Sequence, residues 1–202
     1  MIIEKYKTIF IHIPKNAGSS IKNYFKYSSS YNTHRTIDQI KQENPEAYNS
    51  YRKFAIVRNP YDRMVSWYFY LKKEMEKEHL KGDWRWKSGE YFASNFKEWV
   101  KYPMGDHYPK WKISNTSNSK DLIKCNISLL SPQYAWIDDT VNILKYENIS
   151  KDLNNFFEEQ IDIPIFNNSK HEYYLNYYDK DSLDIVYDRY KQDFDKFNYK
   201  KL

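Results

Sequence analysis

The chain has 202 residues, of which 41% are hydrophobic and 29% are charged. This length and balance predict one globular domain, over residues 1–202, with a hydrophobic core of its own. The formal net charge of +5 suits an anionic ligand but is too small to indicate a nucleic-acid-binding protein. No apolar run approaches the roughly 18 residues that a membrane span needs, which argues against a membrane-spanning segment.

Cysteine usage favours a reducing compartment. Cys125 is the one cysteine in the chain, so an internal disulfide is excluded. The first residues also carry no apolar core of the kind found in signal peptides. These two features predict a cytoplasmic location.

The first predicted element is a buried parallel strand over residues 8–13, an apolar run that Pro14 ends. Ile21, Tyr24 and Phe25 follow at the spacing of a helical stripe. A second strand is predicted over residues 54–57.

A helix to about residue 77 is predicted next, because Asn59 and Pro60 supply an N-cap and a first-turn proline. Residues 79–125 are rich in Trp, Lys, Gly and Ser with weak periodicity, which indicates a variable segment of helices and loops on the acceptor side. The remaining chain predicts a helix over residues 131–137, a strand over 141–144, and helices over 150–159 and 181–197. Strands that alternate with helices predict an α/β protein, a P-loop-like three-layer fold with a central parallel sheet flanked by helices.

A candidate phosphate-binding loop lies between the first strand and its helix, over residues 14–20. Gly18 would let the backbone approach an anion, and the N–H groups of a strand–loop–helix junction point in one direction. Lys15 adds a positive charge, and Ser19 and Ser20 add hydroxyl donors. An ordinary turn with a serine cap is the alternative interpretation.

The loop differs from a Walker A motif, which requires lysine directly after its second glycine. Here Ser19 follows Gly18, and the lysine of the loop comes earlier, at position 15. No predicted strand ends in an obvious acid for Mg²⁺, which a kinase or ATPase needs. This difference favours another phosphorylated donor.

A second anion site is predicted at the end of the second strand. Arg58 would leave the sheet at the same edge as residues 14–20, if the two strands are parallel. Ser66 follows Asn59 by about two helical turns, on a similar face of the helix. An arginine fork and a hydroxyl suit a terminal phosphate monoester, although a salt bridge could also explain Arg58. Arg63 is interpreted as a surface charge.

Residues 11–20 resemble the 5′-phosphosulfate loop of the sulfotransferases that use 3′-phosphoadenosine-5′-phosphosulfate (PAPS), and residues 54–66 resemble their 3′-phosphate motif. The resemblance is greatest to the carbohydrate-type branch, which includes heparan and chondroitin sulfotransferases. Asn16 and Ser19 replace the threonines usual in the loop. Segments at 131–138, 145–148, 167–170 and 184–199 also resemble the family, whereas residues 79–125 do not.

The resemblance implies transfer of a sulfuryl group from PAPS to an acceptor hydroxyl, with 3′-phosphoadenosine-5′-phosphate (PAP) as product and no metal. It implies that Lys15 contacts the oxygen bridging phosphorus and sulfur, and that Arg58 and Ser66 hold the 3′-phosphate. The implied donor-binding residues are Lys15, Asn16, Ala17, Gly18, Ser19, Ser20, Arg58, Ser66, Asn167, Ser169 and Lys170.

The acceptor hydroxyl needs a general base, and His34 lies where relatives in this branch often carry a catalytic histidine. An imidazole with a pKa near ~6.5 can accept a proton at neutral pH. A helix-flanking histidine beside a Thr36 cap is the alternative for His34. His12 is interpreted as a buried strand residue, and His107 and His171 are rival bases.

A set of aromatic residues among lysines suits a sugar acceptor, although such a set more often forms the core of a lid of helices. Its members are Trp84, Trp86, Tyr91, Trp99, Tyr102, Tyr108 and Trp111. Two other functions stay open at this point. One is a P-loop kinase of a small metabolite, and the other is a non-catalytic module that binds nucleotide or RNA.

Overall fold

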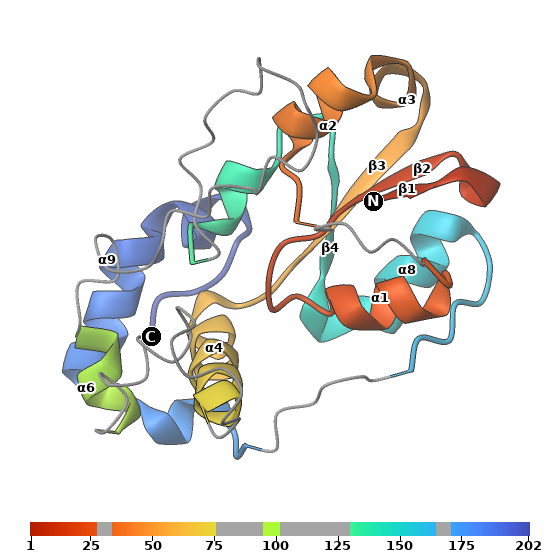
Figure 1. Cartoon of the computed structure of the whole chain (residues 1–202). Helices are drawn as coiled ribbons and strands as arrows, with labels where there is room; N and C mark the ends of the chain where they lie inside the picture. The colour runs from red at the N-terminus through yellow and green to blue at the C-terminus, as the bar shows by residue number, and fades with distance from the viewer. Residues whose placement is uncertain (28–33, 76–94, 102–129, 165–170) are drawn as a thin grey trace. The chain divides into compact units, whose positions relative to one another are not determined.

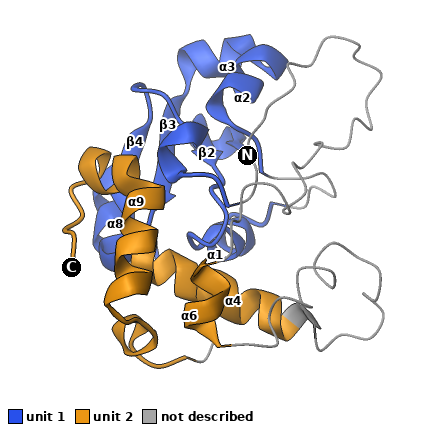
Figure 2. Ribbon diagram, turned by 90° about the vertical axis from the view of Figure 1, so that its left-hand side faces the viewer, with its two compact units in different colours: residues 1–58, 111–167 blue, residues 59–110, 168–202 orange. Residues whose placement is uncertain are grey.

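The computed structural model describes residues 1–27, 34–75, 95–101, 130–164 and 171–202 (Figure 1). These residues form two compact units, coloured separately in Figure 2. The first unit comprises residues 1–58 and 111–167, and the second comprises residues 59–110 and 168–202. A single domain over residues 1–202 stays a prediction. No helix in the described ranges is both long and apolar enough to cross a membrane.

The first unit contains a sheet of four strands in the order β1-β2-β3-β4. Strands β2 (Thr8–Ile11), β3 (Arg52–Val57) and β4 (Asn142–Lys145) are parallel neighbours. The short strand β1 (Ile2–Ile3) pairs antiparallel with β2. The prediction of an α/β fold around a mostly parallel sheet is therefore confirmed.

Among the described residues of this unit, three helices lie between β2 and β3 in the chain, and a fourth follows β4. They are α1 (Gly18–Tyr24), α2 (Ile37–Glu43), α3 (Pro45–Ser50) and α8 (Ile149–Phe157). Short 3-10 turns occur at η1 (Glu4–Tyr6), η4 (Gln133–Trp136) and η5 (Tyr146–Asn148). Thr36 and Gln39 form a capping box that begins α2, in which each side chain bonds the other residue's backbone N–H.

The helix predicted over residues 131–137 is wrong, because the segment makes only the single turn η4. Pro132 has an extended backbone before the turn, and Ile137 is extended after it. The side chain of Gln133 also bonds the backbone of Arg58, which fixes this segment against the sheet.

The core of the first unit lies between the sheet and helices α1 and α8 (Figure 1). Phe10 and Phe54 are register partners on β2 and β3, and their rings stack with centroids 4.9 Å apart. The buried members of this core are Met1, Ile3, Phe10, Ile21, Phe54, Ile56, Leu144, Leu153, Phe157 and Ile161. The apolar strands thus hold α1, and with it the loop that precedes α1.

The second unit contains α4 (Pro60–Met75), α6 (Phe96–Lys101), the 3-10 turn η6 (Tyr174–Tyr177) and α9 (Lys180–Lys196). Helices α4, α6 and α9 pack against one another. Tyr61 contacts Phe194 with ring centroids 4.8 Å apart, and Arg189 donates a 2.9 Å bond to the carbonyl of Val100.

The interpretation of Arg63 as a surface charge is wrong. Its side chain is 1% exposed, and its guanidinium lies 5.9 Å from the ring centroid of Tyr190. The sequence pattern did not reveal this because the burial comes from α9, more than one hundred residues away along the chain.

Candidate active site

The candidate phosphate-binding loop has an unusual backbone between β2 and α1. Lys15 has a φ of 70° and Ala17 a φ of 57°, both in the left-handed region. Such conformations cost a residue with a side chain roughly 1–3 kcal/mol, so the surrounding structure must hold them. Alternation of this kind turns successive backbone N–H groups toward a common concave side, which is an arrangement that binds anions.

Gly18 has a packing role that the sequence did not reveal. A Cβ atom built on Gly18 would lie 1.7 Å from Nε2 of His12, so no residue with a side chain fits unless the imidazole moves. The ring of His12 therefore occupies the space beneath the first turn of α1. Packing against His12 therefore explains why glycine is found at position 18, in addition to the predicted close approach of an anion.

Asn16 is fully buried and braces the loop against the sheet. Its Nδ2 donates 2.7 Å bonds to the carbonyl oxygen of Ile56 and to Oε1 of Gln133. The amide nitrogen is thus used within the protein, whereas its buried Oδ1 has no hydrogen-bond partner there. Asn16, which was predicted to bind the donor, therefore attaches the loop to β3.

Arg58 follows β3 directly and lies beside the loop. Its Nη1 donates a 3.3 Å bond to the carbonyl oxygen of Lys15, and its guanidinium carbon lies 4.2 Å from the ring centroid of Tyr146. The residue is only 7% exposed. The structure therefore brings together Arg58 and the residues 14–20, as the parallel strands predicted.

The rings of His12 and His34 are in contact next to the loop, with centroids 4.0 Å apart and planes tilted by 35°. Nδ1 of His34 lies 2.9 Å from the carbonyl oxygen of His12. Because a carbonyl only accepts, Nδ1 carries the proton and Nε2 of the neutral ring can accept one. Trp136 approaches His34 edge-on, with centroids 6.4 Å apart.

Burial is the largest influence on both histidines. It lowers the pKa of His34, which the bond to the His12 carbonyl partly opposes. Burial, followed by the charge of His34, lowers the pKa of His12 well below its ordinary value. Both rings are therefore neutral near pH 7. His34 also flanks the helix that Thr36 caps. The alternative interpretation, a helix-flanking histidine, therefore describes its position correctly, although the ring also contacts His12.

The other predicted donor-binding residues have different locations. Ser20 is buried and Ser19 is exposed at the start of α1. Ser66 is buried in α4, in the second unit, so Arg58 and Ser66 belong to different units. Asn167, Ser169 and Lys170 lie outside the described residues.

Most of the acceptor-side segment, including His107 and six members of the aromatic set, also lies outside the described residues. Trp99 is described, and it is buried against Tyr68 and Phe96 in the second unit. For Trp99 the core interpretation is thus confirmed. His171 stacks on Phe69 in the second unit, with centroids 5.3 Å apart.

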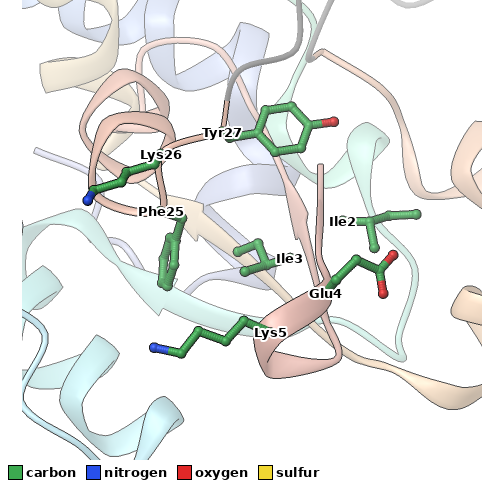
Figure 3. Close-up of a pocket in the computed structure, with 7 residues that line it drawn as sticks. All are labelled: Ile2, Ile3, Glu4, Lys5, Phe25, Lys26 and Tyr27. Atoms are coloured by element: carbon green, nitrogen blue, oxygen red, sulfur yellow. The ribbon is translucent and has the colours of Figure 1, made fainter.

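A cavity of about 430 Å³ opens at the other end of α1 (Figure 3). Its lining residues are Ile2, Ile3, Glu4, Lys5, Phe25, Lys26 and Tyr27. The helical residues 21–24 separate the loop from this end, a length of about 6 Å, and none of the lining residues belongs to the loop. The cavity is therefore distinct from the candidate active site. In the described residues, no group of three or more His, Cys, Asp or Glu side chains could hold a metal ion.

Comparison with known proteins identifies the family. The model of the sulfotransferase family matches residues 1–200. The chain belongs to the sulfotransferase family. Neither the curated proteins nor the solved structures gave a significant match. The family match confirms the resemblance seen in the two phosphate motifs, and the carbohydrate-type branch is consistent with it.

Membership of this family means that the protein transfers a sulfuryl group to an acceptor. Gln133 is the residue of the site that sequence reasoning missed, since its segment resembled the family but gave the side chain no role. Only the folded chain reveals that a glutamine 75 residues beyond Arg58 bonds its backbone.

Gly18→Ala should destabilise the sulfotransferase by about 1–3 kcal/mol, because the new methyl group overlaps the His12 ring. The loss should be smaller in a His12→Ala background, where the methyl group has room. Chemical denaturation of the four proteins in this cycle measures the coupling. Ser19→Ala, at an exposed position of α1, is the matched control with little effect. An equal loss in both backgrounds would contradict the packing role of His12.

Stability should depend on pH through the histidine pair. The lowered pKa values mean that, below about pH 6.5, the unfolded chain binds protons that the folded chain excludes. The free energy of unfolding should therefore fall as the pH drops from about 7.5 to about 5.5. His12→Gln should reduce this slope in denaturation measured at both pH values. An unchanged slope in the variant would show that another group causes the acid sensitivity.

Proposed function

We propose that this sulfotransferase transfers the sulfuryl group of PAPS to a hydroxyl group of a carbohydrate. The observation that carries the proposal is the 3.3 Å bond from the Arg58 guanidinium to the carbonyl of Lys15. This bond places the permanent positive charge of Arg58, in the second predicted motif, beside the backbone of the loop over residues 14–20. A donor with both a 5′-phosphosulfate and a 3′-phosphate suits two neighbouring anion-binding elements.

In the proposed complex, the residues 14–20 hold the 5′-phosphate, while Arg58 and Ser66 hold the 3′-phosphate. Backbone N–H groups of the loop supply many of the proposed bonds to the 5′-phosphate. The left-handed backbone of Lys15 and Ala17 supports this proposal, because it turns successive N–H groups to one side. The bonds that Asn16 makes to Ile56 and Gln133 support a bracing role for its amide nitrogen. Asn167, Ser169 and Lys170 complete the proposed donor site from the C-terminal side.

The proposed reaction is an in-line displacement at sulfur. The acceptor oxygen bonds to sulfur as the bond from sulfur to the bridging oxygen breaks, and PAP leaves with the electron pair. The Lys15 ammonium stabilises the negative charge that develops on that oxygen. Nε2 of His34 takes the proton of the acceptor hydroxyl, which the tautomer fixed by the His12 carbonyl allows.

A carbohydrate acceptor is supported by the resemblance to the carbohydrate-type branch and by the aromatic residues predicted on the acceptor side. Aromatic faces pack well against the apolar faces of sugar rings. A cytoplasmic location is also proposed, on the ground that Cys125 has no second cysteine in the chain to pair with.

PAP should raise the thermal unfolding midpoint of the protein without Mg²⁺, and more than ATP with Mg²⁺ does. Lys15→Ala should keep binding PAP yet lose at least about 100-fold in kcat, the usual effect of removing a group that stabilises developing charge. Sulfate transfer from labelled PAPS to a panel of oligosaccharides measures the second effect.

Lys41→Ala, on α2 of the same unit, is the matched lysine control and should transfer at the normal rate. Stabilisation by MgATP but not by PAP would reject PAPS as donor. Full turnover by Lys15→Ala would instead reject only the role of that lysine.

His34→Gln should reduce kcat by about 10²–10⁴-fold and leave PAP affinity unchanged, because an amide can bond the His12 carbonyl but cannot act as a base. In the unmodified enzyme, kcat/KM should fall in acid, below pH 6.5, because burial lowers the pKa of His34. The comparison is a pair of pH–rate profiles. His171→Gln serves as the control, and loss of turnover in that variant alone would transfer the base assignment to His171.

A further inference from the structure

The fully buried side chain of Gln133 forms hydrogen bonds with Arg58 and Asn16, which belong to the same first unit. Its Nε2 donates a 2.9 Å bond to the carbonyl oxygen of Arg58. Its Oε1 accepts a 2.9 Å bond from the backbone N–H of Arg58 and a 2.7 Å bond from Nδ2 of Asn16. One amide group therefore bonds both predicted phosphate-binding motifs.

The backbone of Arg58 needs hydrogen-bond partners from a side chain because of where it lies in the sheet. The last paired residues of the β3–β4 ladder are Val57 and Lys145, so the backbone of Arg58 lies one residue beyond it. A primary amide offers the same N–H donor and carbonyl acceptor as a peptide group. The Gln133 side chain thus continues the ladder and satisfies both backbone groups of a residue that is only 7% exposed.

The bond to Asn16 extends this restraint to the loop. Asn16 lies between Lys15 and Ala17, the two residues with left-handed backbone, and its amide nitrogen also bonds Ile56 on β3. Gln133 and Asn16 consequently hold the loop and the end of β3 at a fixed separation. A buried network in which an amide has several partners is rigid, because loss of one partner leaves others unsatisfied.

We propose that Gln133 is a positioning residue that matches the spacing between the residues 14–20 and Arg58 to the spacing between the two phosphate groups of the donor. This inference rests on the proposed function, since it assumes that these two elements bind the two ends of PAPS. Gln133 itself contacts the protein rather than the donor. Gln133 should therefore increase the affinity for a ligand that carries both phosphates more than the affinity for a ligand that carries only one.

The test compares PAP, which has both phosphates, with 5′-AMP, which lacks the 3′-phosphate, by calorimetric titration. The unmodified enzyme should prefer PAP. In Gln133→Ala this preference should fall by at least about tenfold, a change of about 1.4 kcal/mol in coupling, mainly through weaker PAP binding. A role in stability alone would weaken both ligands equally or neither.

Gln39→Ala is the matched control. Gln39 is also a buried glutamine of the first unit that bonds backbone, but its partner is Thr36 in the capping box of α2. This variant should lower the thermal unfolding midpoint and keep the preference for PAP. An equal loss of preference in Gln39→Ala and Gln133→Ala would overturn the proposal.

Gln133→Glu provides a second test if the alanine variant does not fold. The carboxylate keeps an acceptor for Arg58 and Asn16, loses the bond donated to the Arg58 carbonyl, and adds a negative charge. Its preference for PAP should be smaller than that of the unmodified enzyme, and full preference would overturn the proposal. Absence of any preference in the unmodified enzyme would instead reject the proposed donor site and the inference with it.

Discussion

The parallel pairing of β2 with β3 is the constraint on which the candidate site depends. It aligns Ile11 with Ala55, so the chain leaves both strands at the same edge of the sheet. Two loops that are about forty residues apart in sequence become neighbours, and Arg58 can bond the carbonyl of Lys15. Burial of Phe10 and Phe54 between the sheet and its helices supplies the apolar free energy that maintains this register.

The site contains several features that are unfavourable in isolation. Two residues with side chains have positive φ, polar amides are buried, and two imidazoles lie in contact where burial disfavours their charge. Two of these groups have specific partners within the protein: the Asn16 amide nitrogen bonds Gln133, and the His34 ring bonds the carbonyl of His12. Such local costs commonly accumulate where a protein holds groups in place for binding or chemistry.

The sequence predicted much of the first unit because its signals are local. The apolar runs at β2, β3 and β4 and the cap at Asn59 were readable directly, to within a few residues. Helices α2 and α3 were not predicted, since they are short and their apolar residues show little periodicity. The turn η4 was predicted as an α-helix because a count of apolar spacing does not include the tertiary bonds of Gln133.

The sequence by itself determined the sulfotransferase family and the α/β fold, because the strands and the two motifs that resemble the family are contiguous in the chain. Only the tertiary structure decided what surrounds the loop over residues 14–20. Gly18 is required by the ring of His12, Asn16 braces β3, and Gln133 joins the loop to Arg58. These relations depend on distances between residues far apart along the chain, which no local pattern encodes.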